Sequence, residues 1–563
     1  MVQTQEVVQR DRFSKNVVFE SISRTLALVG GVVSSVILWR AIRFGFWSID
    51  EYAVVRILSN ANAILLPLAL LGINGAIVRV IPEYITDRLK IGRTIGFSVL
   101  VSTVTSLAVI LLSTLLMLDV LLLQDALEEG LTLEALRFYW VIILITILPT
   151  AYLRMARAAF WGVQRVRYAV YIDIVYNLIR TGSLIALFIY GGISILSVLA
   201  LNLVLAVICA AYGLGVLASL MRENSIPWGF NPGREIIAKI VRVSLVGLVG
   251  TIAVANLNNA TTIWISPAGY GTNEDVGYYS IAQSVSETVR TLAAAPLVVL
   301  GPNLALEYGI GRRDEIRRKF RESSRALLPL SAFLFATVFV FAEPILRVLY
   351  GADSVPSAYY LRVMSFEQMA VVIPGLYYNL FFSVDDVRGM VYSSLTQILF
   401  QTLWIVTLAP LIGVVAIPLV WISYLAHFAL MHVYSRRKHE IVVDQKSVIG
   451  SMVLGVGFTL IMWILVTIVG ALARDLPVPD VVIAGGTCML LIPLWYAYMY
   501  LAIRTRVLGP TELKNFASVI RVIPPVWWMS KGLIVRLEAI VPSGDLQDSS
   551  PGEPRAESDH RHD

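Results

Sequence analysis

The chain has 563 residues, of which 57% are hydrophobic and only 15% are charged, and its mean hydropathy is +0.74. A soluble protein of this length would divide into domains and carry more charge, so the composition excludes a soluble globular protein. In a membrane protein the net charge of +6 reports on orientation rather than on nucleic-acid binding. Cys209 and Cys488 both lie in apolar runs and predict no disulfide framework.

Apolar runs of the length that crosses a bilayer recur along the whole chain and predict an all-α polytopic membrane protein with about 14 transmembrane helices. The predicted spans are residues 22–39, 52–78, 91–118, 138–156, 168–190, 193–217, 243–265, 278–299, 326–349, 360–382, 390–411, 414–434, 448–473 and 481–501. Basic residues gather in every second connection, with a dense run at 312–325, whereas 119–134 and 266–275 contain no Lys or Arg. The exceptions are Arg40, Arg43, Arg347 and Arg474. Because positive charge favours the cytoplasmic side, this alternation predicts an even number of helices with both termini in the cytoplasm.

A repeated sequence indicates that the chain contains two related halves. Residues 163–171 read VQRVRYAVY and residues 384–392 read VDDVRGMVY, with five identical positions. Upstream, at a slightly different offset, Leu136, Arg137, Pro149 and Tyr152 match Leu361, Arg362, Pro374 and Tyr377. Six helices separate the copies, so the halves have the same orientation, and duplicated halves that enclose a central site are common in transporters.

The predicted organisation is therefore two parallel six-helix lobes around a central cavity plus two extra C-terminal helices. The boundaries are an N-lobe at 1–221, a cytoplasmic linker at 222–242, a C-lobe at 243–435, helices 13 and 14 at 447–503, and a cytoplasmic tail at 504–563. The tail begins with a mixture of aromatic and basic residues that suits a membrane surface and ends in a polar, disordered segment.

Polar side chains lie inside several predicted spans, where a charged group is costly and usually faces a cavity or a partner. Within each helix they share a face, as the i, i+4, i+7 spacing of Asp173, Asn177 and Arg180 illustrates. The candidate cavity residues are Arg24, Arg56, Asn60, Asp173, Asn177, Arg180, Asn256, Asn259, Gln283, Glu287, Arg290, Gln397 and Gln401. The span at 360–382 also holds Glu367 and Gln368.

Two interpretations of these residues are open. As a cavity lining, the arginines would attract anions and match phosphate oxygens with a planar fork of donors, while Asn and Gln would bind a hydroxyl-rich ligand. As structural residues, Glu287–Arg290 and Asp173–Arg180 would be internal ion pairs, with the amides bonding between helices. Arg24 lies near a membrane edge, where an arginine also reaches headgroups. Pro149 and Pro374 interrupt helices at equivalent positions and are candidate hinges or ordinary kinks.

Residues 71–84 read LGINGAIVRVIPEY, in which a Gly-containing helix end leads through Arg79 to Pro-Glu-Tyr and a basic loop. This segment, with Asp50-Glu51-Tyr52 at the start of the same span, resembles the prokaryotic polysaccharide flippases. These form the polysaccharide-transport (oligosaccharide flippase) family of the multidrug/oligosaccharidyl-lipid/polysaccharide exporter (MOP) superfamily, whose members share the count of 14 helices. The resemblance implies two lobes around a cavity that opens alternately to each side. Its relatives among the lipid II flippases imply cavity arginines on helices 1, 2 and 8, which here carry Arg24, Arg56 and Arg290, and a lipid-tail groove along helices 13 and 14.

The resulting hypothesis is a flippase in the plasma membrane of a prokaryote. It would move a polyprenyl- or dolichyl-(di)phosphate-linked oligosaccharide from the cytoplasmic to the external leaflet by alternating access, for polysaccharide or glycoprotein-glycan biosynthesis. The expected partners are this lipid-linked oligosaccharide, membrane lipids and glycosyltransferases or a polymerase of the same pathway, without nucleic acid.

The sequence motifs also bear on functions other than a flippase. It has no Walker loop, no G-x-S-x-G and no metal-ligand cluster, so no enzyme, cofactor or metal is expected. A membrane glycosyltransferase is disfavoured because no connection is long enough for a catalytic domain. Two alternatives stay open: a multidrug or organic-cation antiporter of the same superfamily, and a non-transporting scaffold of a glycan assembly complex.

Overall fold

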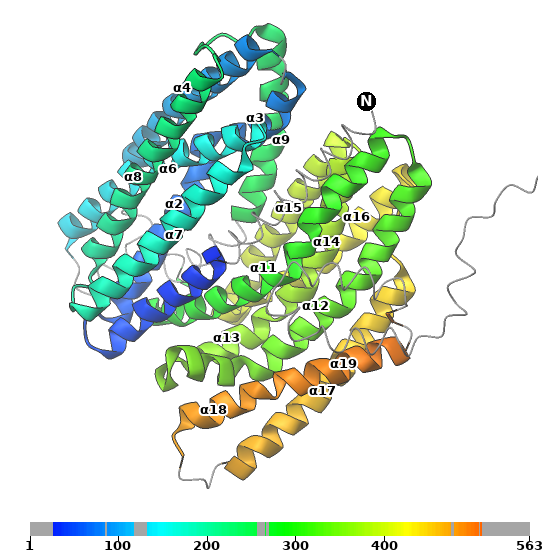
Figure 1. The fold of residues 1–563 in the computed structure, drawn as a ribbon. Helices are drawn as coiled ribbons and strands as arrows, with labels where there is room; N and C mark the ends of the chain where they lie inside the picture. The colour runs from blue at the N-terminus through cyan, green and yellow to red at the C-terminus, as the bar shows by residue number, and fades with distance from the viewer. Residues whose placement is uncertain are drawn as a thin grey trace, which may run out of the picture.

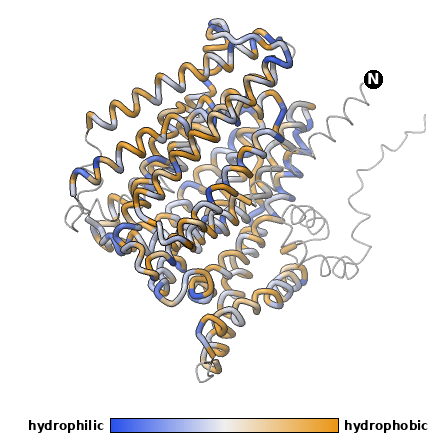
Figure 2. Tube along the Cα trace, turned by 60° about the vertical axis from the view of Figure 1, so that its left-hand side comes forward, coloured by the Kyte–Doolittle hydropathy of each residue, from blue (hydrophilic) through white to orange (hydrophobic). Residues whose placement is uncertain are grey.

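The structure is a computed structural model that describes residues 26–84, 87–116, 132–255, 265, 269–473, 478–505 and 507–508. Over these residues the chain is helical and contains no β-strand. Ten of the described helices are long and apolar enough to cross a membrane. Hydrophobic residues run along the helices and hydrophilic residues gather near their ends (Figure 2). The prediction of an all-α polytopic membrane protein is confirmed.

The helices form two bundles and a C-terminal group (Figure 1). The first bundle contains helix Leu26–Arg43, α2 (Ile49–Leu70), α3 (Ile73–Val80), η1 (Ile81–Tyr84), α4 (Arg88–Leu115), α6 (Leu133–Gly162), α7 (Val166–Ile189) and α8 (Ile195–Glu223). The second bundle contains α11 (Asn273–Gly309), α12 (Arg313–Tyr350), η3 (Ala352–Ser354), α13 (Ser357–Met364), α14 (Phe366–Ser383), α15 (Val387–Ile412), η4 (Gly413–Ala416), η5 (Pro418–Ser423) and α16 (Tyr424–Lys438). Helix α9 (Arg234–Ala255) packs against α2 and α3 of the first bundle and against α15 of the second. The C-terminal group contains α17 (Gln445–Ala473), α18 (Asp480–Met489) and α19 (Leu491–Arg504), and it packs against α12.

Four of the fourteen predicted spans are not among these ten helices. The description of α9 stops at Ala255, before the end of the predicted span. The predicted span at 278–299 lies within the longer helix α11. A break at Ser365 separates α13 from α14, and the span predicted at 414–434 begins as two short 3-10 helices before α16.

The predicted continuous span at 52–78 is wrong, because a left-handed break divides it into α2 and α3. Leu71 and Gly72 have φ angles of 47° and 73°, which end an α-helix. A Cβ atom at Gly72 would lie 2.3 Å from the carbonyl oxygen of Ser244 and 2.6 Å from the backbone nitrogen of Leu248 on α9. Only glycine allows this approach, so the break places α3 directly against α9.

The repeated sequence forms the same turn in both bundles. Gln164, between α6 and α7, has a φ of 59°, and Asp385, between α14 and α15, has a φ of 56°. In the next position, the backbone N–H of Arg165 donates to a carbonyl five residues earlier at 2.8 Å, and that of Asp386 does the same at 2.8 Å. The two copies thus share their backbone conformation at this turn.

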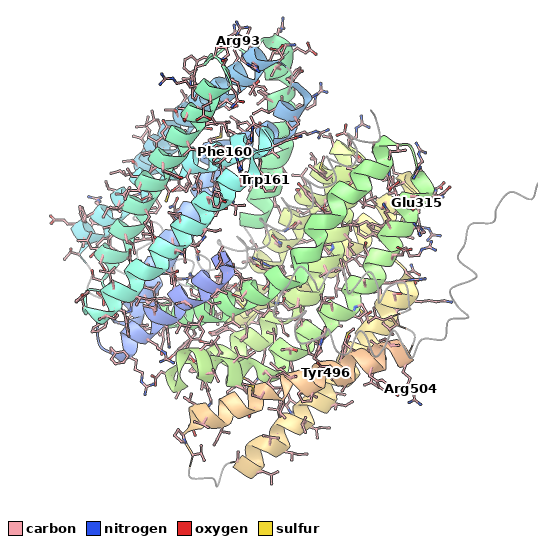
Figure 3. All side chains as sticks on the ribbon, in the orientation of Figure 1. Arg93, Phe160, Trp161, Glu315, Tyr496 and Arg504 are labelled. Carbon is pink, nitrogen blue, oxygen red and sulfur yellow. The ribbon has the colours of Figure 1, made fainter. Side chains whose placement is uncertain are left out.

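The connection between α8 and α9 is seated on the first bundle by two glycines of α4. A Cβ at Gly92 would lie 1.9 Å from the carbonyl oxygen of Pro227, and one at Gly96 would lie 2.2 Å from that of Gly229. Because Gly92 and Gly96 are one helical turn apart, they form a notch that receives residues 226–230. Arg93, labelled at the extremity of the first bundle in Figure 3, borders the notch, since its Cγ would lie 2.6 Å from a Cβ at Gly229.

Replacing Gly92 with alanine is expected to destabilise the protein by about 1–3 kcal/mol, because the new methyl group meets backbone rather than a movable side chain. The matched control is Gly215→Ala on α8, where a Cβ meets no atom within 4 Å and alanine improves helix propensity. The measurement is the apparent melting temperature in detergent. Equal melting temperatures for the two variants would contradict the notch.

The two bundles contact each other at both ends of the helices. At the Ser48 end, named after the residue that caps α2, the hydroxyl groups of Ser35 and Tyr350 lie 2.7 Å apart. The rings of Trp39 and Tyr278 are 5.9 Å apart at the same end. At the opposite end, the Arg79 end, Arg79 of α3 forms an ion pair with Asp385.

Candidate functional site

The predicted site residues divide between the two bundles. Arg24, Asn256 and Asn259 lie outside the described residues. In the first bundle, Arg56 and Asn60 are on α2, and Asp173, Asn177 and Arg180 are on α7. In the second bundle, Gln283, Glu287 and Arg290 are on α11, and Gln397 and Gln401 are on α15.

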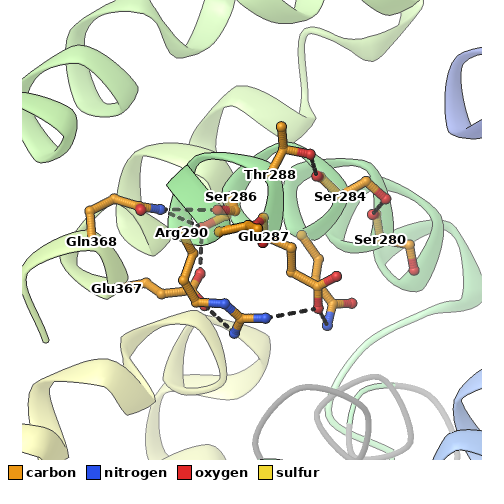
Figure 4. A network of polar contacts seen from close by, with 10 residues as sticks. Ser280, Ser284, Ser286, Glu287, Thr288, Arg290, Glu367 and Gln368 are labelled. Carbon is orange, nitrogen blue, oxygen red and sulfur yellow. Dashed lines mark hydrogen bonds and ion pairs between the residues drawn. The ribbon is translucent and has the colours of Figure 1, made fainter. Parts of the chain in front are cut away.

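Arg290 is held between two carboxylates (Figure 4). Its Nη1 atom donates to Oε1 of Glu367 at 2.6 Å, and its Nη2 atom lies 3.8 Å from Oε1 of Glu287. Ser286 donates to the second oxygen of Glu367, and Gln283 donates to Glu287 at 3.2 Å. The Glu367 side chain is only 4% exposed, and that of Arg290 is 18% exposed. The predicted pair of Glu287 and Arg290 is therefore present, but Glu367 is the closer and more buried partner.

The amides of α15 meet this network through Tyr424. Gln397 and Gln401 both donate to the Tyr424 hydroxyl, at 2.7 Å and 3.1 Å. Tyr424 interacts electrostatically with Arg290 and Glu367. Polar groups thus connect α15, α16, α14 and α11 inside the second bundle.

In the first bundle, Asp173 pairs with Arg157 of α6 rather than with Arg180. Its Oδ2 atom lies 2.6 Å from Nη2 of Arg157. Asn177 donates to the backbone carbonyl of Asp173 at 2.8 Å. The predicted pair of Asp173 and Arg180 is wrong because the two residues are two turns apart, about 10 Å along α7, whereas Arg157 faces Asp173 from the antiparallel helix.

Arg154 is an exposed arginine on the side of α6 that faces away from lipid. The apolar stripe of α6 consists of Phe138, Val141 and Ile145, which are 54%, 49% and 51% exposed. At 100° per residue Arg154 points to the opposite face, yet it is also exposed. The inner side of α6 therefore has solvent-accessible surface at this arginine.

The sequence analysis did not select Arg154 and Arg157 as site residues, because they lie at the end of the predicted span at 138–156, where a basic cytoplasmic connection is expected. Both lie within α6, which ends at Gly162. The signal that identifies them is their distance from the repeated turn, because residues seven and ten positions before Gln164 belong to the helix. Glu367 was noted in its span but not selected, since its partner is 77 residues away.

Arg56 on α2 has no ion pair or hydrogen bond with any residue that the structure describes. Its Nε atom is buried and lacks a hydrogen-bond partner. The phenol groups of Tyr52 and Tyr350 are within electrostatic range, and Asn60 is buried one turn further along α2. Among the same described residues, Arg180 likewise has no carboxylate partner.

The described site residues give the two bundles opposite charge. The first bundle holds four arginines and one carboxylate on α2, α6 and α7, whereas the second holds one arginine and two carboxylates on α11 and α14. The residues are Arg56, Arg154, Arg157, Arg180 and Asp173 in the first bundle, and Arg290, Glu287 and Glu367 in the second. Anion attraction is therefore concentrated on the first bundle.

A separate ionic cluster lies at the Arg79 end, where Asp386 caps α15. Lys438 donates to its Oδ1 atom at 2.7 Å, and Nε2 of His439 lies 2.7 Å from its Oδ2 atom. The backbone N–H of Gly389 donates at 3.0 Å. Burial alone would raise the pKa of Asp386, but hydrogen bonds from Lys438, Gly389, His439 and Tyr434 lower it to about 2.

The Asp386 cluster predicts a stability contribution that depends on pH. Because the pKa is depressed from the ordinary value of 3.8 to about 2, the carboxylate stabilises the fold fully above about pH 5 and loses this effect between about pH 4 and pH 2. Replacing Asp386 with Asn should cost at most about 2 kcal/mol near neutral pH, since Lys438 is partly exposed and solvent weakens the pair. The gap in melting temperature between wild type and variant should narrow as the pH falls through this range. Asp353→Asn at an exposed pair with Arg43 is the control, and a gap that is constant with pH would refute the role of Asp386.

Pro149 lies inside α6 and Pro374 inside α14, and both helices continue beyond them to Gly162 and Ser383. Their role as hinges stays a prediction. Within the part of the chain that the structure describes, no group of three or more His, Cys, Asp and Glu is placed to hold a metal ion.

Comparison with known proteins identifies the family. A sequence-family model described as polysaccharide biosynthesis protein matches residues 15–305, and one described as MatE matches residues 248–407. A comparison of the sequence with curated proteins finds no match.

Among solved structures, the fold is similar to lipid II flippase MurJ in an inward closed conformation, with a TM-score of 0.62, 13% identity, and coverage of 86% of this chain and 99% of that one. It is similar to an inward-facing multidrug resistance MATE transporter, with a TM-score of 0.57, 16% identity, and coverage of 76% and 98%. A MOP superfamily transporter from Pyrococcus furiosus gives a TM-score of 0.54 at 15% identity, with coverage of 76% and 96%.

At these identities the structural likeness establishes the fold, which is that of the MOP transporters. The first family model covers more than half of the sequence. The chain therefore belongs to the polysaccharide biosynthesis protein family of the MOP superfamily and is a multi-pass membrane protein.

Proposed function

We propose that the protein is a flippase that moves a polyprenyl- or dolichyl-(di)phosphate-linked oligosaccharide from the cytoplasmic to the external leaflet. The observation that carries this proposal is the set of arginines turned toward the interior of the first bundle, of which Arg56 and Arg180 have no carboxylate partner among the described residues. Such guanidinium groups bind phosphate oxygens through charge-assisted, bidentate hydrogen bonds. Within the membrane they are costly unless an anion or water meets them.

The neutral polar residues are suited to the sugar portion of this substrate. Gln283, Gln397 and Gln401 carry amide groups that both donate and accept hydrogen bonds. Asn60 and Asn177 supply the same chemistry from the first bundle. In this proposal the diphosphate lies against the first bundle, the glycan extends toward the second, and the polyprenyl chain remains in lipid between the bundles.

Movement would follow from rocking of the two bundles about the proline-containing helices, so that the contacts at the Ser48 end and at the Arg79 end separate in turn. In this orientation the Arg79 end and both termini face the cytoplasm, and the membrane is the plasma membrane of a prokaryote. The basic residues of the N-terminal turns of α12 lie at that end, in agreement with the preference of positive charge for the cytoplasmic side. Glycosyltransferases or a polymerase of the same pathway would supply and consume the substrate.

A second candidate is an antiporter for organic cations, because the MatE model matches residues 248–407 and MATE transporters share the fold. A cation site requires a carboxylate that is available to the ligand. Asp173 and Glu367 are both paired with arginine, and Glu287 lies 3.8 Å from Arg290. The net positive first bundle therefore favours an anionic substrate.

The test is a lipid analysis of a strain that lacks the protein. We expect accumulation of glycolipid in the inner leaflet, its export on return of the wild-type chain, and strongly reduced export on return of Arg56→Ala or Arg290→Ala. An organic-cation exporter would instead keep its drug resistance in these variants. Normal glycan export by both variants would contradict the flippase and favour a scaffold.

A further inference from the structure

An ion pair sets the register of the antiparallel helices α6 and α7, and an electrostatic interaction agrees with it. Arg157 forms an ion pair with Asp173, and Arg154, three residues earlier on α6, interacts electrostatically with Tyr176, three residues later on α7. Continuing the same register by four residues places Arg180 level with Thr150. At 1.5 Å per residue, Arg180 is about 6 Å farther than Arg154 from the turn that joins the helices.

The burial pattern directs this row of side chains toward the interior of the first bundle. On α7, Tyr171, Val175, Leu178 and Ile185 are exposed and apolar, which marks the face toward lipid. At 100° per residue, Asp173 and Arg180 point away from that face. Arg154 points away from the lipid face of α6 in the same manner, so both helices contribute to one inner surface.

The charges on this inner surface do not balance. Arg154 and Arg157 are neighbours at spacing i, i+3, so their guanidinium groups repel each other. Asp173 pairs with Arg157, whose Nε atom is buried and lacks a hydrogen-bond partner. Arg154 is exposed to solvent. An additional anion is therefore the missing component, and a diphosphate supplies the oxygens that two adjacent guanidinium groups require.

We infer that Arg154 and Arg157 form a diphosphate-binding site on the inner face of α6, with Asp173 as an internal competitor that occupies Arg157 when the site is empty. Arg180 receives the anion at the next level along the row. The site is distinct from Arg56 and Arg290, which lie on α2 and α11. The identity of the anion as the headgroup of the transported lipid rests on the proposed function, whereas the existence of the site does not.

The test uses full-length protein purified in detergent, inorganic diphosphate as the probe, and phenylglyoxal labelling of arginines read by peptide mass spectrometry. We expect diphosphate to protect Arg154 from the reagent and to leave Arg167, an exposed arginine near the start of α7, unprotected. Asp173→Asn should reach half-protection at about tenfold less diphosphate, because the competing carboxylate is gone. Arg157→Gln should require at least about tenfold more.

The two variants are expected to shift the diphosphate concentration at half-protection in opposite directions, and this distinguishes a ligand site from a structural ion pair. If the pair were only structural, both variants would lower the melting temperature and neither would shift protection. Arg167→Gln is the charge-matched control and should behave as wild type. Superimposable protection curves for wild type, Asp173→Asn and Arg157→Gln would overturn the inference.

The same protection assay with other ligands identifies the source of the phosphate. Protection by polyprenyl diphosphate at lower concentration than by inorganic diphosphate would support a lipid-linked substrate. Protection by phosphatidylglycerol in nanodiscs, without any effect of either diphosphate, would overturn the assignment to a diphosphate.

Transport assays keep the two proposals apart. If diphosphate protects Arg154 while proteoliposomes move no lipid-linked oligosaccharide, the site stands and the flippase fails. If transport proceeds in Arg154→Gln with unchanged half-saturation, the flippase stands and the assignment of the site to the transported headgroup fails.

Discussion

Replacing Glu367 with alanine is expected to destabilise the protein by about 3–5 kcal/mol, because it leaves a buried arginine without its principal counter-ion. Glu367 accepts from Arg290 at 2.6 Å and from Ser286, and its side chain is almost fully buried. After the substitution only Glu287 remains near Arg290, at 3.8 Å. The measurement is the apparent melting temperature of the purified protein in detergent.

The matched control for Glu367 is a pair with the same chemistry at the surface. Glu315, labelled in Figure 3, accepts from Arg318 at 2.7 Å, and Arg318 is 60% exposed. Glu315→Ala should therefore cost no more than about 1 kcal/mol. The double variant Glu367→Ala with Arg290→Met removes both buried charges and should recover most of the stability. Equal effects of Glu367→Ala and Glu315→Ala would show that burial of the pair does not matter.

Replacing Arg56 with alanine is expected to lower glycan export about tenfold to a hundredfold while leaving the melting temperature nearly unchanged. Arg56 has no carboxylate or hydrogen-bond partner among the described residues, so its removal breaks no contact within the fold. Each charge-assisted hydrogen bond that the guanidinium makes to phosphate contributes about 1.5–3 kcal/mol, which is the source of the expected loss. Export would be measured in the deletion strain at equal protein level.

Two further substitutions define what Arg56 contributes. Arg56→Lys keeps the charge and loses the planar fork, so it should retain part of the export. Arg56→Glu should abolish export, since it places a negative charge where the phosphate is proposed to bind. Arg88→Ala, at an exposed arginine in the first turn of α4, is the control and should export normally. A large fall in melting temperature for Arg56→Ala would contradict the binding role and indicate a structural one.

Local patterns in the sequence predicted much of the fold and part of the site. The apolar runs located the helices, and the faces shared by Gln283, Glu287 and Arg290 were visible from spacing alone. Gln164 and Asp385, at matching positions of the repeat, occupy the same turn.

Tertiary pairing was not predictable in the same way. Glu367 pairs with Arg290, which is 77 residues away in the sequence. Asp173 pairs with Arg157 on the neighbouring antiparallel helix and not with Arg180 on its own helix. The break at Gly72 depends on the close approach of α9, which no local rule contains. Spacing within a helix thus predicts which residues share a face, whereas the neighbouring helix decides which of them are neutralised.

The glycine notch on α4 limits how far α9 can move away from the first bundle. Residues 226–230 are seated against Gly92 and Gly96, and α9 starts at Arg234. Only the three residues 231–233 connect the notch to α9. Fully extended, three residues reach about 10 Å. A wider separation of α9 from α4 therefore requires residues 226–230 to leave the notch or the first turn of α9 to unwind. The aperture offered to a bulky glycan at this end is thereby governed by a short tether rather than by the strength of the contacts around it.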